Sequence, residues 1–374
     1  MAITRLGPNQ DITAAKIAGT INFKNLIING DMSIAQRGTS QASVGTSFTY
    51  FTVDRFKLGG SGSSGARFTM SQDTDVPTGQ GFAKSLKMDV TTADGSLGAS
   101  DSIQIVQRIE GQNLQYLKKG TSNAESLTLS FWVKSNKTGT YIAELRDTDN
   151  SRTISKAYTI DSASTWEKKT LTFEGDTTGT FNNDNGESLR LLHWLYAGTD
   201  YTSGTLATSW ESLTAANRAV GQVNLADSTD NNWWITGIQL EADTSASDFE
   251  FLPYDVNLMR CQRYYQKTYN LNDAPASSTF TGHLDISGFS DGSSNLLFAI
   301  PFKVRMRTTP TVTYYTSGGT SGQWYAGRNG SGGNATATSY SGRTAESNLS
   351  TYVNLGASWT GGFVAGHYTV DAEL

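Results

Sequence analysis

Alternation of apolar and polar residues is the feature that most limits how this chain can fold. In Ser126–Lys134 every second residue is apolar, and these residues share one face: Leu127, Leu129, Phe131 and Val133. Because successive side chains of a strand point to opposite sides, the pattern predicts a strand with one buried face and with Trp132 on the other. Ser188–Tyr196 is apolar on both faces, so we expect a central strand or one whose outer surface is covered. In Trp233–Glu241 the apolar residues share a face only if Gly237 forms a bulge.

The composition favours an all-β protein. Gly accounts for 38 of 374 residues, and charged residues make up 17%, below the usual ~25%. Ser, Thr and Asn take their place, which suits a neutral, polar surface with many turns. Leu26–Ile28 is a short apolar run that predicts the first strand, with Asn29-Gly30 as the turn after it. Near the C-terminus, Gly318–Ser341 predicts a long loop.

One segment has a helical period. Leu258, Cys261, Tyr265 and Tyr269 are three, four and four residues apart, which places them on one face of a helix over Asp255–Tyr269. This predicted helix lies between two β regions and connects them.

Several classes of protein are excluded by the sequence. The net charge is −5 and no large basic cluster occurs, so we expect no nucleic-acid binding. A single cysteine, Cys261, excludes an internal disulfide. No apolar run approaches the ~20 residues of a membrane span, so we expect no membrane insertion. The first ten residues lack a secretory h-region, which predicts synthesis in a bacterial cytoplasm.

The sequence contains no catalytic motif. The histidines are far apart, and Asp147–Asn150 begins like a calcium loop but lacks its Gly and distal Glu. A glycosidase needs two carboxylates close together, and spacing singles out no pair among the candidates Asp101, Glu110, Glu144, Glu187 and Glu211. We therefore predict no enzyme activity, no catalytic residue and no metal-ligand set.

Two segments resemble a known family. NLIINGDMSIAQRG at Asn25–Gly38 and GIQLEADTSASDFEFLPYDVNLMRCQRYYQK at Gly237–Lys267 resemble, in that order, segments of bacteriophage tail-fibre and virion appendage proteins. The strand at Ser126–Lys134, a later Trp before a strand and the final IQLE strand resemble carbohydrate-binding modules with a jelly-roll fold. The resemblance covers roughly residues 100–255.

The resemblance implies the organisation of the chain. It is expected to be all-β, with a jelly-roll β-sandwich, one connecting α-helix and a second C-terminal β domain. The expected parts are a virion-anchor segment at 1–24, the carbohydrate-binding-like jelly roll at 25–255, the helix at 256–270 and a β tip domain at 271–374. Sugar-binding jelly rolls often carry a structural calcium ion, so the resemblance allows a bound calcium ion in this chain. Asp31 and Arg37 are expected to hold the joint between the anchor and the sandwich.

The resemblance also implies a function. The chain is expected to be a structural protein of the virion, a homotrimeric tail fibre that adsorbs to a host surface glycan or protein receptor. Residues 1–24 would bind other virion proteins. A head (capsid) fibre or decoration protein is an alternative within the virion, and a glycan depolymerase is the alternative from another class.

Candidate contact residues are mostly aromatic, because sugars stack their C–H faces on rings. For the outward-facing rings of the sandwich, a subunit or domain interface and a second core layer remain open as alternatives. The glycan or receptor candidates are Trp132, Trp194, Tyr196, Trp324, Tyr325 and Arg328. In the resembling fibre proteins the L-x-x-C-Q-R-Y-Y segment precedes a region that trimerises, which makes Leu258, Cys261 and Tyr265 the candidates for a trimer interface.

Overall fold

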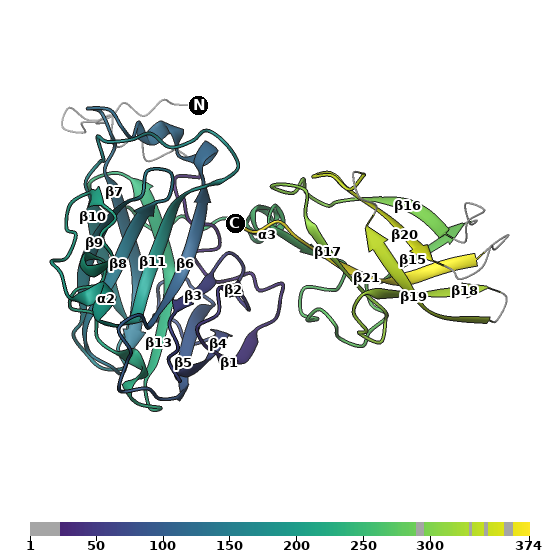
Figure 1. Cartoon of the computed structure of the whole chain (residues 1–374), viewed down its shortest axis with the longest axis horizontal. Coiled ribbons are helices and arrows are strands. Elements are labelled where there is room, and N and C mark those ends of the chain that lie inside the picture. Colours follow the sequence, from purple (N-terminus) through teal and green to yellow (C-terminus); the bar gives the residue numbers. More distant parts are fainter. Residues whose placement is uncertain (1–22, 289–294, 329–330, 340–342, 355–361) are drawn as a thin grey trace, which may run out of the picture.

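The computed structural model describes residues 23–374 except 289–294, 329–330, 340–342 and 355–361. A β-sandwich and a C-terminal β region lie side by side, with helix α3 and the C-terminus at their junction (Figure 1). All strands that pair among the described residues do so in antiparallel orientation. No helix among the described residues is long and apolar enough to cross a bilayer.

The sandwich has two sheets. The first sheet consists, in spatial order, of β1 (Ser40–Val44), β4 (Arg67–Asp73), β5 (Ser85–Thr92), β13 (Asn232–Ala242), β7 (Leu127–Ser135) and β10 (Glu167–Phe173). The second consists of β12 (Glu211–Ser212), β9 (Arg152–Ile160), β8 (Gly139–Asp147), β11 (Glu187–Ala197), β6 (Ser102–Glu110), β3 (Lys57–Ser61) and β2 (Thr49–Tyr50). The chain changes sheet at nearly every connection from β5 onward, which gives the predicted jelly roll.

The strand patterns of the sandwich are confirmed. Leu129, Phe131 and Val133 of β7 are buried in the main core, whereas Trp132 is partly exposed. The register between β13 and β7 shifts between Thr236 and Gln239, so the bulge forms as predicted at Gly237.

Strand β11 is covered on both faces. Leu189 and Leu191 point into the main core, and Trp194 points outward under the segment that contains Tyr201 and Leu206. This segment includes the short helix α2 (Thr199–Thr202) and the 3-10 turn η3 (Ala215–Asn217). Further 3-10 turns are η1 (Gly111–Asn113), η2 (Gln115–Leu117) and η4 (Leu225–Asp227).

The C-terminal region is a second β structure with its own core. Its eight-stranded sheet has the order β14 (Tyr265–Lys267), β21 (Gly362–Asp371), β18 (Gln323–Arg328), β19 (Ser331–Ser339), β20 (Asn348–Asn354) and β16 (Asn295–Pro301). The other two strands, β15 (Leu284–Gly288) and β17 (Thr311–Tyr315), both pair with β21. Trp324, Val353 and Val364 are at the centre of this core.

Three sequence predictions are wrong in the structure. Leu26–Ile28 is buried but is not a strand, and the first strand is β1. The predicted loop Gly318–Ser341 contains the hairpin of β18 and β19, because cross-strand pairing and burial of Trp324 outweigh its Gly-rich composition. Helix α3 covers only Tyr254–Gln262, and the chain then pairs as β14 with β21, so aromatic β propensity and a partner strand end the helix early.

Candidate functional site

The Asn25–Gly38 segment forms a joint between the sandwich, helix α3 and the end of the chain. Asn29 adopts a left-handed backbone with φ 63°, and its amide nitrogen donates to the carbonyls of Ile34 at 2.9 Å and Asp54 at 3.0 Å. A Cβ on Gly30 would lie 2.1 Å from the Ile238 carbonyl oxygen, so only glycine fits this approach to β13. Asn29-Gly30 therefore makes the predicted turn.

Helix α3 and the C-terminal tail bind to the same segment. Asn257 of α3 donates to Asp31 at 3.1 Å, and Arg37 forms an ion pair with Asp371 at 2.9 Å. Arg37 also lies 3.8 Å from the centre of the Tyr265 ring. Asp31 and Arg37 thus bind helix α3 and the C-terminal tail, each of which lies more than 200 residues later in the sequence.

A buried charge cluster closes the joint. Glu373 forms ion pairs with Arg37 at 3.4 Å and with Arg55, and the Arg55 guanidinium lies 3.5 Å from the centre of the Tyr264 ring. Burial raises the pKa of the Glu373 carboxyl above its usual value, although the two guanidinium groups oppose this shift. The charges are paired, so their burial at the joint is tolerated.

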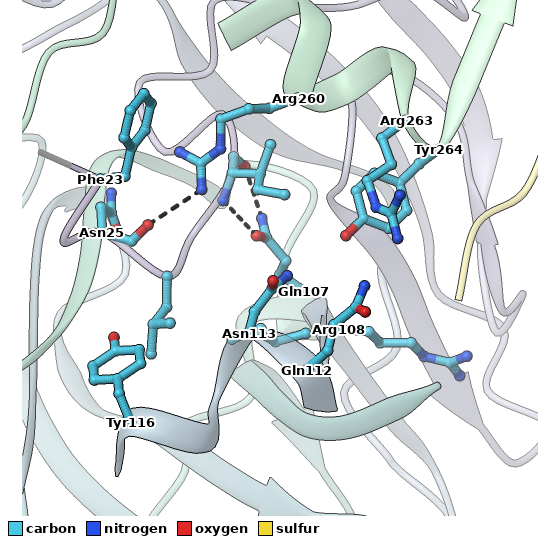
Figure 2. Close-up of a pocket in the computed structure, with 13 residues that line it drawn as sticks. Phe23, Asn25, Gln107, Arg108, Gln112, Asn113, Tyr116, Arg260, Arg263 and Tyr264 are labelled. Carbon is cyan, nitrogen blue, oxygen red and sulfur yellow. Dashed lines mark hydrogen bonds between the residues drawn. The ribbon is translucent and has the colours of Figure 1, made fainter. Parts of the chain in front are cut away.

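A pocket of about 390 Å³ lies beside this joint. Figure 2 shows Phe23 and Tyr116 around it, with Arg260 reaching from α3 toward the Asn25 carbonyl, to which it donates at 3.3 Å. Phe23 and Tyr116 are exposed by 56% and 49%. Gln107 is bound to the backbone of Ile28 through both amide atoms. The polar groups of this pocket are therefore largely engaged in holding the joint.

A second pocket, of about 310 Å³, lies on the outer face of the first sheet, and we call it the aromatic pocket. Its walls include Trp132 and three phenylalanines whose ring centres are 4.8–5.1 Å apart: Phe82, Phe249 and Phe251. Phe251 is 51% exposed. The bulge at Gly237 shapes the pocket, because a Cβ there would lie 2.5 Å from the Phe82 ring.

Exposed polar groups surround these rings. Gln80, Lys168 and Asp248 line the aromatic pocket and are exposed. Lys168 is directly opposite Trp132 in the pairing of β10 with β7, so the two side chains leave the sheet on the same side. Ring faces with donors and acceptors beside them match the chemistry of a sugar, which has apolar C–H faces and hydroxyl edges.

The predicted contact residues differ in their exposure. Trp132 lines the aromatic pocket and Tyr325 is 36% exposed, whereas the Arg328 side chain lies outside what the structure describes. The other three predictions are corrected, because Trp194, Tyr196 and Trp324 are fully buried. The indole of Trp194 donates to Glu144, Tyr196 stacks on Phe68 in the sandwich core, and the indole of Trp324 donates to the His367 carbonyl.

The predicted trimer residues contact their own chain. Cys261 is buried against Ile28, Ile34 and Tyr264, and burial raises the pKa of its thiol. Tyr265 is 5% exposed and belongs to β14, and Leu258 packs partly on the Cys261 cluster. A helix seam through Leu258, Cys261 and Tyr265 is therefore wrong, because the Asn25–Gly38 segment occupies that face.

The aromatic pocket was only partly predictable. Alternation in β7 identifies Trp132 as outward-facing, but Phe249 and Phe251 lie in a segment without regular structure. The sequence shows two phenylalanines close together before Pro253, but this spacing does not predict which surface their rings cover.

The acidic loop at Asp147 is held by an ammonium group. Lys119 Nζ lies 2.6 Å from Asp147 and 3.1 Å from Asp176, and it donates to the carbonyls of Thr178 and Gly179. No group of three or more metal-ligating side chains occurs among the described residues.

Each carboxylate considered for hydrolysis has a structural partner. Asp101 accepts from backbone amides at 2.7 Å, Glu110 binds Arg263, and Glu144 binds Arg218. Glu187 binds Arg108 and Arg190, and Glu211 accepts from Asn217.

No protein-family model and no curated protein matches this chain. Among solved structures, it is similar to the enzymatically active domain of tailspike protein 4 of bacteriophage CBA120, with 13% identity, 59% of this chain and 22% of that domain covered, and a TM-score of 0.31. It is similar to a putative sugar binding protein of Bacteroides thetaiotaomicron, with 10% identity, coverage of 59% and 100%, and a TM-score of 0.32. The family 11 carbohydrate-binding module of a Clostridium thermocellum cellulase has 13% identity, coverage of 55% and 98%, and a TM-score of 0.27.

Proposed function

We propose that this chain is a structural protein of a bacteriophage virion, a trimeric tail fibre or appendage that adsorbs to glycans of the host surface. The observation that carries the proposal is the aromatic pocket. Trp132 offers a partly exposed ring and Phe251 an exposed one, and Gln80, Lys168 and Asp248 offer hydrogen bonds beside them. Weak contacts of this kind hold a particle when several copies engage together.

Self-association is proposed to involve the C-terminal region. Phe280 is 73% exposed there, and Leu297, Tyr325 and Phe363 are each exposed by 36–38%. Tyr325 and Phe363 lie together, with ring centres 5.9 Å apart, and this exposed apolar pair is the surface that we propose for contact with another subunit. Native mass spectrometry at micromolar concentration is expected to give a trimer, and a monomer would contradict this part of the proposal.

The proposed attachment to other virion proteins involves residues 1–24, of which 1–22 lie outside the described part of the chain. A head fibre or decoration protein would also have to attach to other virion proteins. Labelling the chain in intact particles and locating it by electron microscopy distinguishes tail from head.

The glycan site is tested with Trp132→Ala. Loss of an aromatic anchor costs about 2 kcal/mol or more, so binding to extracted host surface polysaccharide is expected to weaken at least tenfold. Trp166→Ala is the matched control, because Trp166 is also partly exposed but binds Asp75 outside the pocket. Equal binding by both variants would rule out the aromatic pocket as the glycan site.

A glycan depolymerase is the competing function. The carboxylates described above are bound to cations or amides, which favours binding over hydrolysis. Release of reducing ends from the same polysaccharide by the purified protein would favour the enzyme.

A further inference from the structure

Three arginines lie side by side on the outer face of the second sheet. Arg190 of β11 is directly opposite Arg108 of β6 and Arg146 of β8, and we call these three residues the arginine ladder. Directly opposite residues of antiparallel strands point to the same side, and neighbouring strands are about 4.8 Å apart. Like charges in such positions destabilise a sheet unless anions neutralise them.

The ladder is incompletely neutralised. Glu187 forms ion pairs with Arg108 at 2.9 Å and with Arg190 at 2.6 Å. Arg146 Nε is shielded from water and has no hydrogen-bond partner within the residues that the structure describes. The two carboxylates whose charges act on Arg146, Glu144 and Glu187, are already paired with other arginines. The next cation, Arg218, is already paired through two nitrogens with Glu144 at 2.8 and 3.0 Å.

A fourth cation and an aromatic ring lie beside the ladder. Lys57 Nζ lies 4.2 Å from the centre of the Phe48 ring, over which Arg108 and Arg190 lie at 4.9 and 5.7 Å. Burial and the charges of Arg108 and Arg190 lower the pKa of Lys57 to about 8. Phe48 itself is 45% exposed. A cationic surface with a half-exposed aromatic ring thus occurs on a chain whose net charge is −5.

We propose that the arginine ladder binds an acidic glycan, whose carboxylate or phosphate groups pair with Arg146 and its neighbours while a sugar ring packs on Phe48. Guanidinium groups bind both kinds of oxyanion through paired hydrogen bonds. The inference goes beyond the proposed function, because the ladder and the aromatic pocket lie on different sheets and the ladder requires an anionic ligand.

Arg146→Gln tests the ladder. Burial and the charges of Arg218 and Arg190 act against the Arg146 cation more than Glu144 and Glu187 support it, so its removal is expected to leave the melting temperature unchanged or to raise it. Calorimetry with oligogalacturonate is expected to show at least tenfold weaker binding than wild type, and wild-type affinity is expected to fall as salt rises. Lys87→Gln, which removes the same charge from the first sheet, is expected to bind as wild type.

Two further probes identify the anion. A neutral galacto-oligosaccharide of the same length is expected not to compete at the ladder, and inorganic tripolyphosphate reports whether phosphate groups are accepted. If Arg146→Gln weakens binding of either anion, the result supports the site and identifies the anionic group that it binds. Wild-type protein that binds neither anion, or an Arg146→Gln variant that binds as wild type or melts at a lower temperature, overturns the proposal. Trp132→Ala is expected to bind oligogalacturonate normally. The test of the ladder therefore does not depend on the test of the aromatic pocket.

Discussion

His193 is a buried titratable residue in the centre of the sandwich. Neither ring nitrogen has a hydrogen-bond partner within the described chain, and the ring lies 5.0 Å from Phe131 and 6.2 Å from Trp233. Burial lowers the pKa of His193 to about 3. The unfolded chain therefore takes up a proton below pH ~6.5 that the folded chain refuses, so stability is complete above this pH and falls as the pH decreases toward 3.

We expect His193→Leu to reduce this acid sensitivity. Between pH 7.5 and pH 5, wild type is expected to lose about 2 kcal/mol more unfolding free energy than the variant, because 1.5 pH units separate pH 5 from the unfolded pKa. Urea denaturation at both pH values measures the difference. Carboxylates affect both proteins equally, and identical pH dependence would show that the folded chain protonates His193 as readily as the unfolded chain does.

At the scale of elements, the bulge in β13 supports both the fold and the aromatic pocket. Gly237 has a φ of 63°, and a Cβ there would meet the Phe82 ring at 2.5 Å. Gly237→Ala is expected to cost about 1–3 kcal/mol of unfolding free energy and to displace Phe82, which weakens glycan binding. Gly95→Ala, whose added Cβ would meet no atom within 4 Å beyond its chain neighbours, is the control and is expected to bind normally. A stable Gly237→Ala protein with unchanged binding would contradict this role.

Elements with a local signal were predictable, and elements set by distant partners were not. The alternation in β7 and the bulge in β13 can be read from a few neighbouring residues. In contrast, Trp194 points outward as the alternation indicates, yet it is buried because Tyr201 and Leu206 cover it. Helix α3 ends early for the same kind of reason, since Tyr265 pairs with Asp371 more than 100 residues later.

For the whole molecule, the two segments that resemble phage proteins matter because they meet in space. The Asn25–Gly38 segment and helix α3 bind each other through Asp31 and Asn257, and the C-terminal tail binds both. Arg307 extends this joint, because it donates to the carbonyls of Ala372 and Glu373 in the tail and of Asn185 in the sandwich. The sequence indicated a joint at Arg37, but its partners at the end of the chain could not be inferred, since no local pattern connects positions so far apart.

The joint is expected to depend on Glu373. Glu373→Gln leaves the buried Arg55 guanidinium without an anionic partner, which costs about 3–5 kcal/mol when a buried ion pair is broken. Because the tail joins the two β regions, faster hydrogen exchange is expected at Ala372 and in β14, while β7 in the sandwich core exchanges as before. Glu346→Gln is the matched control, since its partner Arg305 is 75% exposed and such pairs contribute about 0–1 kcal/mol. Equal exchange in the two variants would mean that the tail is held by its backbone contacts and by the packing of Leu374, and that the buried charges add nothing to the joint.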